Sequence, residues 1–70
     1  MKENDTFVLS KTTEATVIGE RRMVLLPAGT QVTVVVVFGD SNAPVAYEVE
    51  AYLPRENLYA TATVEVRDVV

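Results

Sequence analysis

The fold is decided by the stretch from residue 45 to residue 66, which reads VAYEVEAYLPRENLYATATVEV. Apolar and polar side chains alternate in two runs, and the turn-forming segment 53–57 separates them. Alternation with a period of two is typical of a strand that buries one face. The runs 45–52 and 58–66 therefore predict two antiparallel strands joined by a short connection.

A third strand, over residues 30–38, comes directly before this stretch and is rich in valine. Pairing Phe38 with Val45 makes every inner pair of the first hairpin apolar, and pairing Tyr52 with Tyr59 does the same for the second. The predicted inner pairs are Val36–Tyr47, Val34–Val49, Val32–Ala51, Ala51–Ala60, Val49–Ala62 and Tyr47–Val64. A slip of one residue in either hairpin would turn Thr and Glu side chains into the core, so the pattern predicts a meander of three strands.

The remaining segments extend this meander into an all-β domain spanning residues 1–70. Residues 6–9 predict a first strand after a frayed segment 1–5, and we expect a short last strand as well. Together these give a small five-stranded antiparallel barrel, closed to hide its edges. The segment 15–26 leaves two interpretations open: two short strands around the turn at Gly19-Glu20, or an irregular excursion that caps the core.

Size and charge restrict the classes of partner. Seventy residues without Cys or Trp bury only about 60% of their unfolded surface, which favours an interface shared between two copies. The net charge of −4 argues against nucleic acid and against anionic membranes. The longest apolar run, Val34–Phe38, falls far short of a membrane span, and no secretory signal is visible. We therefore expect a cytoplasmic protein.

The chain lacks the residue types that most enzymes use for catalysis. Without His and Cys, the usual general base near neutral pH and the usual thiol nucleophile are missing. The two serines, Ser10 and Ser41, lie in no nucleophile motif, and the three glycines stand alone in separate predicted turns. We expect no enzyme, no catalytic residue, no cofactor and no metal.

Three carboxylates define the alternative to a protein-binding role. Glu48 and Glu50 point to the outer face of one strand, and Glu65 lies near Glu48 on the neighbouring strand. Such a patch could hold a divalent cation or a small ligand, although Thr stands beside each glutamate and solvated glutamates are the ordinary finding. The segment Asp40-Ser41-Asn42 has cation ligands too, but a turn held by the Asp side chain explains it more simply.

The main candidate site is an apolar patch on the outer face of the predicted sheet. Alternation turns Val35 and Val37 away from the core, with Ala46 opposite Val37, and Tyr52 and Tyr59 pair on the same outer face. An uncharged strand of this kind aggregates if it is left bare. Either residues 17–26 cover it, or it is buried against a protein partner or a second copy in a homodimer.

The segment Ala46-Tyr47-Glu48-Val49-Glu50-Ala51, between a Val-rich strand and a Leu-Tyr-Ala-Thr-Ala-Thr-Val strand, resembles a group of small bacterial proteins of unknown function. That group is known for an Ala-Tyr-Glu-Val-Glu-Phe strand. The resemblance implies an SH3-like barrel and an accessory role, such as that of an antitoxin or immunity partner, and it brings no catalytic residues. This chain departs from the pattern at Ala51, where Phe is expected, at the entry segment 30–32, which lacks the usual glycines, and in its longer segment 17–26.

Overall fold

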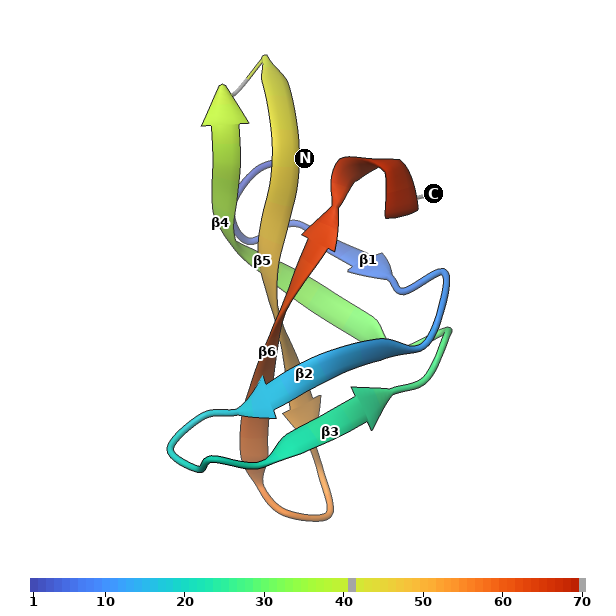
Figure 1. Cartoon of the computed structure of the whole chain (residues 1–70), viewed down its shortest axis with the longest axis vertical. Helices are drawn as coiled ribbons and strands as arrows, with labels where there is room; N and C mark the ends of the chain where they lie inside the picture. Colours follow the sequence, from blue (N-terminus) through green and yellow to red (C-terminus); the bar gives the residue numbers. More distant parts are fainter. Residues whose placement is uncertain (41, 70) are drawn as a thin grey trace.

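The protein folds as one antiparallel sheet of six strands that curls into a half-barrel (Figure 1). The computed structural model describes residues 1–40 and 42–69. The strands are β1 (Thr6–Val8), β2 (Thr13–Val17), β3 (Met23–Leu26), β4 (Gln31–Asp40), β5 (Ala43–Leu53) and β6 (Leu58–Glu65), followed by the 3-10 turn η1 (Val66–Asp68). Their order in the sheet is β1-β4-β5-β6-β2-β3, so β1 and β3 form its two ends.

The meander β4–β5–β6 is the centre of the sheet, as the sequence predicted. The register of its second hairpin is confirmed along its whole length, including the pairs Tyr52–Tyr59 and Ala51–Ala60. The predicted register of the first hairpin is confirmed only at the end away from its turn, where Val34 pairs with Val49.

Beyond Val34 the predicted register of the first hairpin is wrong, because β4 contains a bulge. The pairing steps from Val34–Val49 to Val36–Glu48, which leaves Val35 as an extra residue on β4. One extra residue reverses the direction of the side chains that follow, until a second irregularity between Phe38 and Gly39 leaves Val45 as an extra residue on β5 and restores the original register at Gly39–Pro44. Val37 therefore pairs with Tyr47 on the inner face, and Val36 and Phe38 point outward.

The segment 15–26 forms the hairpin β2–β3, so the first of the two interpretations is confirmed. This hairpin pairs with β6 through Thr16–Thr61 and Val17–Ala60, on the opposite side of the meander from β4. The prediction that residues 17–26 cover Val35 and Val37 is therefore wrong. The five-strand count is also wrong, because β2 and β3 add two strands, whereas residues 66–68 form the turn η1 in place of a last strand.

The core consists mainly of small and medium-sized apolar side chains, together with the ring of Tyr47, on the concave face of the sheet. Its buried members are Leu9, Ala15, Val17, Leu26, Val32, Val34, Tyr47, Val49, Ala51, Ala60, Ala62 and Val64. Alanines face one another where β5 and β6 meet, at Ala51–Ala60. Side chains this small let the sheet curl tightly without leaving space inside.

Residues 1–5, for which the sequence predicted a frayed end, form a turn that is hydrogen-bonded to β4. The Asn4 amide donates to the Val34 carbonyl at 2.8 Å, and the Val34 amide donates to the Asp5 carbonyl at 2.8 Å. Within the described residues, no helical segment has the length and apolar character that crossing a bilayer demands.

Candidate functional site

The five residues of the predicted apolar patch do not form one surface. Val37 packs against the core, and Val35 is half-buried in the bulge. Ala46 is half-buried opposite Phe38, near the tip of the first hairpin. Tyr52 and Tyr59 lie together at the other end of β5, on the convex face of the sheet. The bulge turns Val37 inward, and the six positions along β5 from Ala46 to Tyr52, roughly 20 Å of strand, separate the tyrosines from the hairpin tip.

Tyr52 and Tyr59 form a close aromatic pair on the convex face. Their ring centroids lie 5.2 Å apart with an interplanar angle of 51°. This tilted arrangement is one that aromatic pairs favour, because it brings the positive edge of one ring toward the negative face of the other. Tyr52 is 48% exposed and Tyr59 is 47% exposed, so about half of the surface of each residue is available to a partner.

The turn between β5 and β6 holds the Tyr52 ring in place. The Tyr52 hydroxyl donates to Asn57 Oδ1 at 2.8 Å. Asn57 has a φ of 53°, a left-handed conformation that Asn tolerates better than most residues. The Glu56 amide closes the turn by donating to the Leu53 carbonyl at 3.2 Å. The sequence predicted this turn, but nothing in it indicated the hydrogen bond from the Tyr52 hydroxyl to Asn57.

Ile18, the residue that follows β2, lies opposite Tyr59 of β6. Its amide donates to the Tyr59 carbonyl at 2.8 Å, which places it beside Tyr59, and its side chain is exposed. We name Ile18, Tyr52 and Tyr59 the tyrosine face. Sequence reasoning missed Ile18, because only the pairing of β2 with β6 brings it beside Tyr59.

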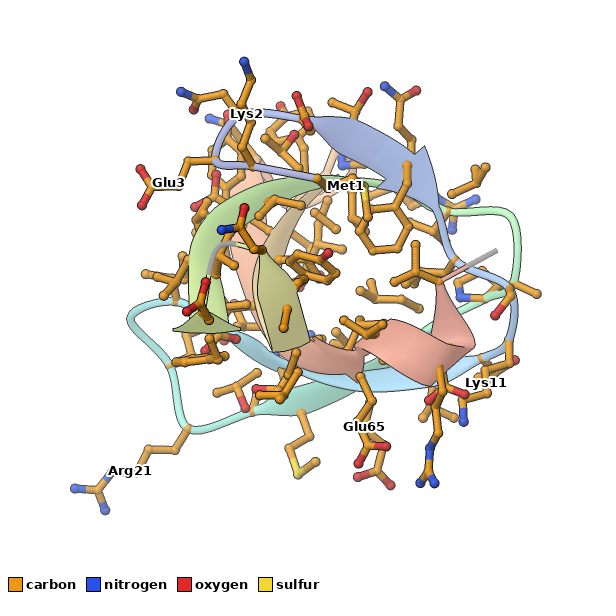
Figure 2. All side chains as sticks on the ribbon, turned by 90° about the horizontal axis from the view of Figure 1, so that it is seen from above. Met1, Lys2, Glu3, Lys11, Arg21 and Glu65 are labelled. Carbon is orange, nitrogen blue, oxygen red and sulfur yellow. The ribbon has the colours of Figure 1, made fainter. Side chains whose placement is uncertain are left out.

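Arg22 joins the two loops that border the tyrosine face, the β2–β3 loop and the β5–β6 turn. Both loops lie at the same end of the molecule (Figure 1). Its Nε donates to Glu20 Oε1 at 3.0 Å, and its Nη2 donates to Glu56 in the β5–β6 turn. The hydrogen bond to Glu56, and then the one to Glu20, raises the pKa of the Arg22 guanidinium. The sequence predicted a solvated turn for Arg21-Arg22; Arg21 does extend outward (Figure 2), whereas Arg22 bridges the loops.

The three carboxylates of the alternative site share the outer face of β5 and β6, with Glu65 diagonal to Glu48, as predicted. Glu48 and Glu50 lie opposite Thr63 and Thr61 on the outer face, as predicted. Glu65 lies opposite Ala46 and forms an ion pair with Arg67 at 2.6 Å. Across residues 1–40 and 42–69, no group of three or more His, Cys, Asp or Glu side chains is placed to hold a metal ion.

The second cation candidate, Asp40-Ser41-Asn42, is a turn in the part that the structure describes. Asp40 Oδ1 accepts a hydrogen bond from the Asn42 amide at 2.8 Å. This is the side-chain turn that the sequence predicted as the simpler interpretation. Ser41 lies outside the described residues.

Among the hollows of the described part of the chain, two lie near these surfaces. One, of about 30 Å³, lies between the segment 9–13, β6 and Asp68, and has room for about one water molecule. The other is an open groove between β3 and the β5–β6 turn, lined mainly by Leu25, Pro27, Leu53 and Pro54. The first hollow is bordered by the Ser10 hydroxyl, which donates to the Asp68 carbonyl at 2.7 Å, and by the ion pair of Lys11 Nζ with Asp68 Oδ2 at 3.2 Å.

Compared with known proteins, the chain matches no family model, no curated protein and no solved structure. The resemblance suggested by residues 46–51 therefore stays a prediction.

Proposed function

We propose that this protein is a non-enzymatic interaction module that binds a protein partner through the tyrosine face. The observation that carries the proposal is the pair Tyr52–Tyr59, which is half exposed and yet fixed by ring packing and by the bond to Asn57. Tyrosines held in this way offer a large contact area at little cost in side-chain entropy. This is the property that enriches tyrosine at protein interfaces.

The surroundings of the tyrosine face indicate the chemistry of the partner. Glu50 lies two residues before Tyr52 on the same outer face of β5, and the protein as a whole carries a net charge of −4. We therefore expect the partner to present an apolar side chain to Ile18 and the rings, with Lys or Arg beside it facing Glu50. The link from Arg22 to Glu56 supports the proposal, because it holds the two bordering loops together before binding.

The proposal also includes a scaffold, a compartment and a biological role for the protein. We infer an SH3-like scaffold in the cytoplasm whose role is that of an accessory, antitoxin-like or immunity-like protein. The absence of His and Cys from the sequence supports a binding role rather than a catalytic one.

Selection of peptides from a displayed random library on the immobilised protein tests the proposal without a known partner. We expect the enriched peptides to combine an aromatic or aliphatic residue with Lys or Arg. Their affinity should fall by about tenfold or more in Tyr59→Glu and in Ile18→Glu, as for residues at the centre of an interface.

Val45→Glu is the matched control, because Val45 is also an exposed apolar residue of this sheet but lies at the other end of β5. It should leave peptide affinity within about twofold, since surface changes away from the contact have small effects. Peptides that bind wild type and Tyr59→Glu equally, or a library that yields no peptide at all, would contradict the proposal.

A further inference from the structure

The outer part of β4 has a free edge. In the sheet order, the neighbours of β4 are β5 on one side and β1 on the other, and β1 pairs only with residues 31–33. Hydrogen bonds from the N-terminal turn extend this cover as far as Val34. In the part of the chain that the structure describes, residues 35–40 have no strand on that side. We name this segment the β4 edge.

The β4 edge combines unpaired backbone with exposed apolar side chains. Val36 is 41% exposed and Phe38 is 39% exposed, both on the outer face. From Gln31 to Gly39 the strand contains no charged residue and no proline. Natural sheets normally protect a free edge with such residues, so an unprotected apolar edge indicates a surface that another strand covers.

Backbone geometry fixes which groups face outward at this edge. Val34 directs its amide and carbonyl to the β1 side, where they bond to Asp5 and Asn4. Neighbouring residues of a strand direct these groups to opposite sides, and the bulge at Val35 shifts the alternation by one residue. The backbone groups of Val37 therefore face the β4 edge.

We propose that the β4 edge pairs with the same edge of a second copy of this chain, antiparallel and centred on Val37. A two-fold axis at Val37 lets each Val37 amide donate to the partner's Val37 carbonyl, and it places Val36 of each copy against the partner's Phe38. The apolar pairs lie side by side on the outer face. Because the first charged residue, Asp40, lies beyond the paired run, no like charges meet within it.

The same features explain why the occupant is a second copy and why the β4 edge joins only two copies. An isologous contact pairs the two β4 edges at once and leaves neither β4 edge open for a further strand, and the free edge of β3 takes no part in it. The bulge at Val35 and the positive φ of Gly39, 95°, bend β4 on either side of the paired run and keep it short. We expect a weak and reversible dimer, with a Kd in roughly the micromolar range, because the interface is small. It does not involve the tyrosine face.

Sedimentation of the synthetic 70-residue chain, with and without an N-methyl group on the Val37 amide, tests the backbone pairing. The wild type should show a monomer–dimer equilibrium, which strengthens with salt because both copies carry a charge of −4. Methylation removes the donor facing the partner and should abolish the dimer while leaving the β-sheet circular dichroism unchanged. N-methyl-Leu25 is the control, because its amide faces the free edge of β3 and should leave the equilibrium unaltered.

Disulfide cross-linking tests the register, and the absence of native cysteine makes single substitutions clean. A mixture of Val36→Cys and Phe38→Cys should form a covalent heterodimer faster than either variant alone, since these residues face each other across the two-fold axis. Leu25→Cys should not cross-link with either.

Three outcomes would overturn the dimer. They are a protein that stays monomeric at millimolar concentration, a dimer that survives methylation of Val37, and Phe38→Cys cross-linking as fast alone as in the mixture. A dimer that Tyr59→Glu dissociates would also overturn it, because the contact would then lie on the tyrosine face. The peptide selection at the tyrosine face is decided independently of all four results.

Discussion

Two valines of β5 show how burial, rather than residue type, sets the contribution of a side chain. Val49 is fully buried between Val34 and Ala62, whereas Val45 is 64% exposed near the tip of the first hairpin. Both were predicted from the sequence to face the core. Alternation alone could not show that the hairpin extends past the core, because the position where packing ends depends on the whole sheet.

Val49→Ala should lower the free energy of unfolding by about 2 kcal/mol, from the two methyl groups removed from the core and the cavity that they leave. Val45→Ala should change it by less than about 0.5 kcal/mol, as expected of an exposed position. Urea denaturation of both variants measures the difference. Equal losses would show that the hairpin tip is packed as tightly as the core.

The pair Tyr52–Tyr59 should couple energetically. In a double-mutant cycle with Tyr52→Ala and Tyr59→Ala, we expect an interaction energy of about 0.5–1 kcal/mol, in the range measured for cross-strand aromatic pairs. Thermal unfolding of the four proteins provides the cycle. A coupling near zero would mean that the rings touch without fixing each other, and the argument for a rigid tyrosine face would fail.

At the scale of the elements, the bulge in β4 decides which residues reach the surface. Val34, Val35, Val36 and Val37 are identical, so the sequence contains no signal for the one that is extra. Apolar alternation indicates a register only where polar residues mark the other face, as they do in β5 and β6. This is why the second hairpin was predicted correctly and the outer half of the first was not.

Deleting one valine from residues 34–37 should produce a regular strand that keeps the observed pairs on both sides of the bulge. Val34 would still face Val49, and Phe38 would still face Ala46. We expect a folded protein with less twist at this point. NMR contacts between these pairs check it: their loss, with new contacts from Phe38 to Val45, would show that the strand shifts its register.

Two turn glycines should respond differently to substitution. Gly19 and Gly39 both have positive φ, 84° and 95°, which costs an alanine about 1–2 kcal/mol. A Cβ at Gly19 would meet no atom within 4 Å, whereas one at Gly39 would lie 3.1 Å from the Val45 amide nitrogen. Gly39→Ala should therefore destabilise the protein more than Gly19→Ala in urea denaturation. The reverse order would mean that Val45 moves aside freely.

For the whole molecule, the sequence predicted an all-β domain built on a meander, and the structure confirms it. It could not predict where the hairpin β2–β3 would attach, because its partner strand β6 is more than forty residues away in sequence. The candidate site was likewise predicted only in part. Tyr52 and Tyr59 were identified together because they belong to one hairpin, whereas Ile18 reaches them only through the pairing of β2 with β6.

Hydrogen exchange should differ between the central and the terminal strands of the sheet. We expect the slowest amides in the centre of β5 and β6, which have paired strands on both sides, and faster exchange in the terminal strands β1 and β3. Exchange measured by NMR at neutral pH reports each amide. Protection of β3 equal to that of β5 would indicate that a further contact covers the free edge of β3.

The N-terminus and the turn η1, near the carboxyl end, lie in the half of the molecule opposite the β5–β6 turn (Figure 1). A fluorophore or a fused carrier protein at either end would therefore leave Tyr52 and Tyr59 accessible. An N-terminal fusion, however, would start beside the turn that bonds to Val34 and would crowd the neighbouring valines. Attachment at the carboxyl end is thus the choice for following both kinds of association in one molecule.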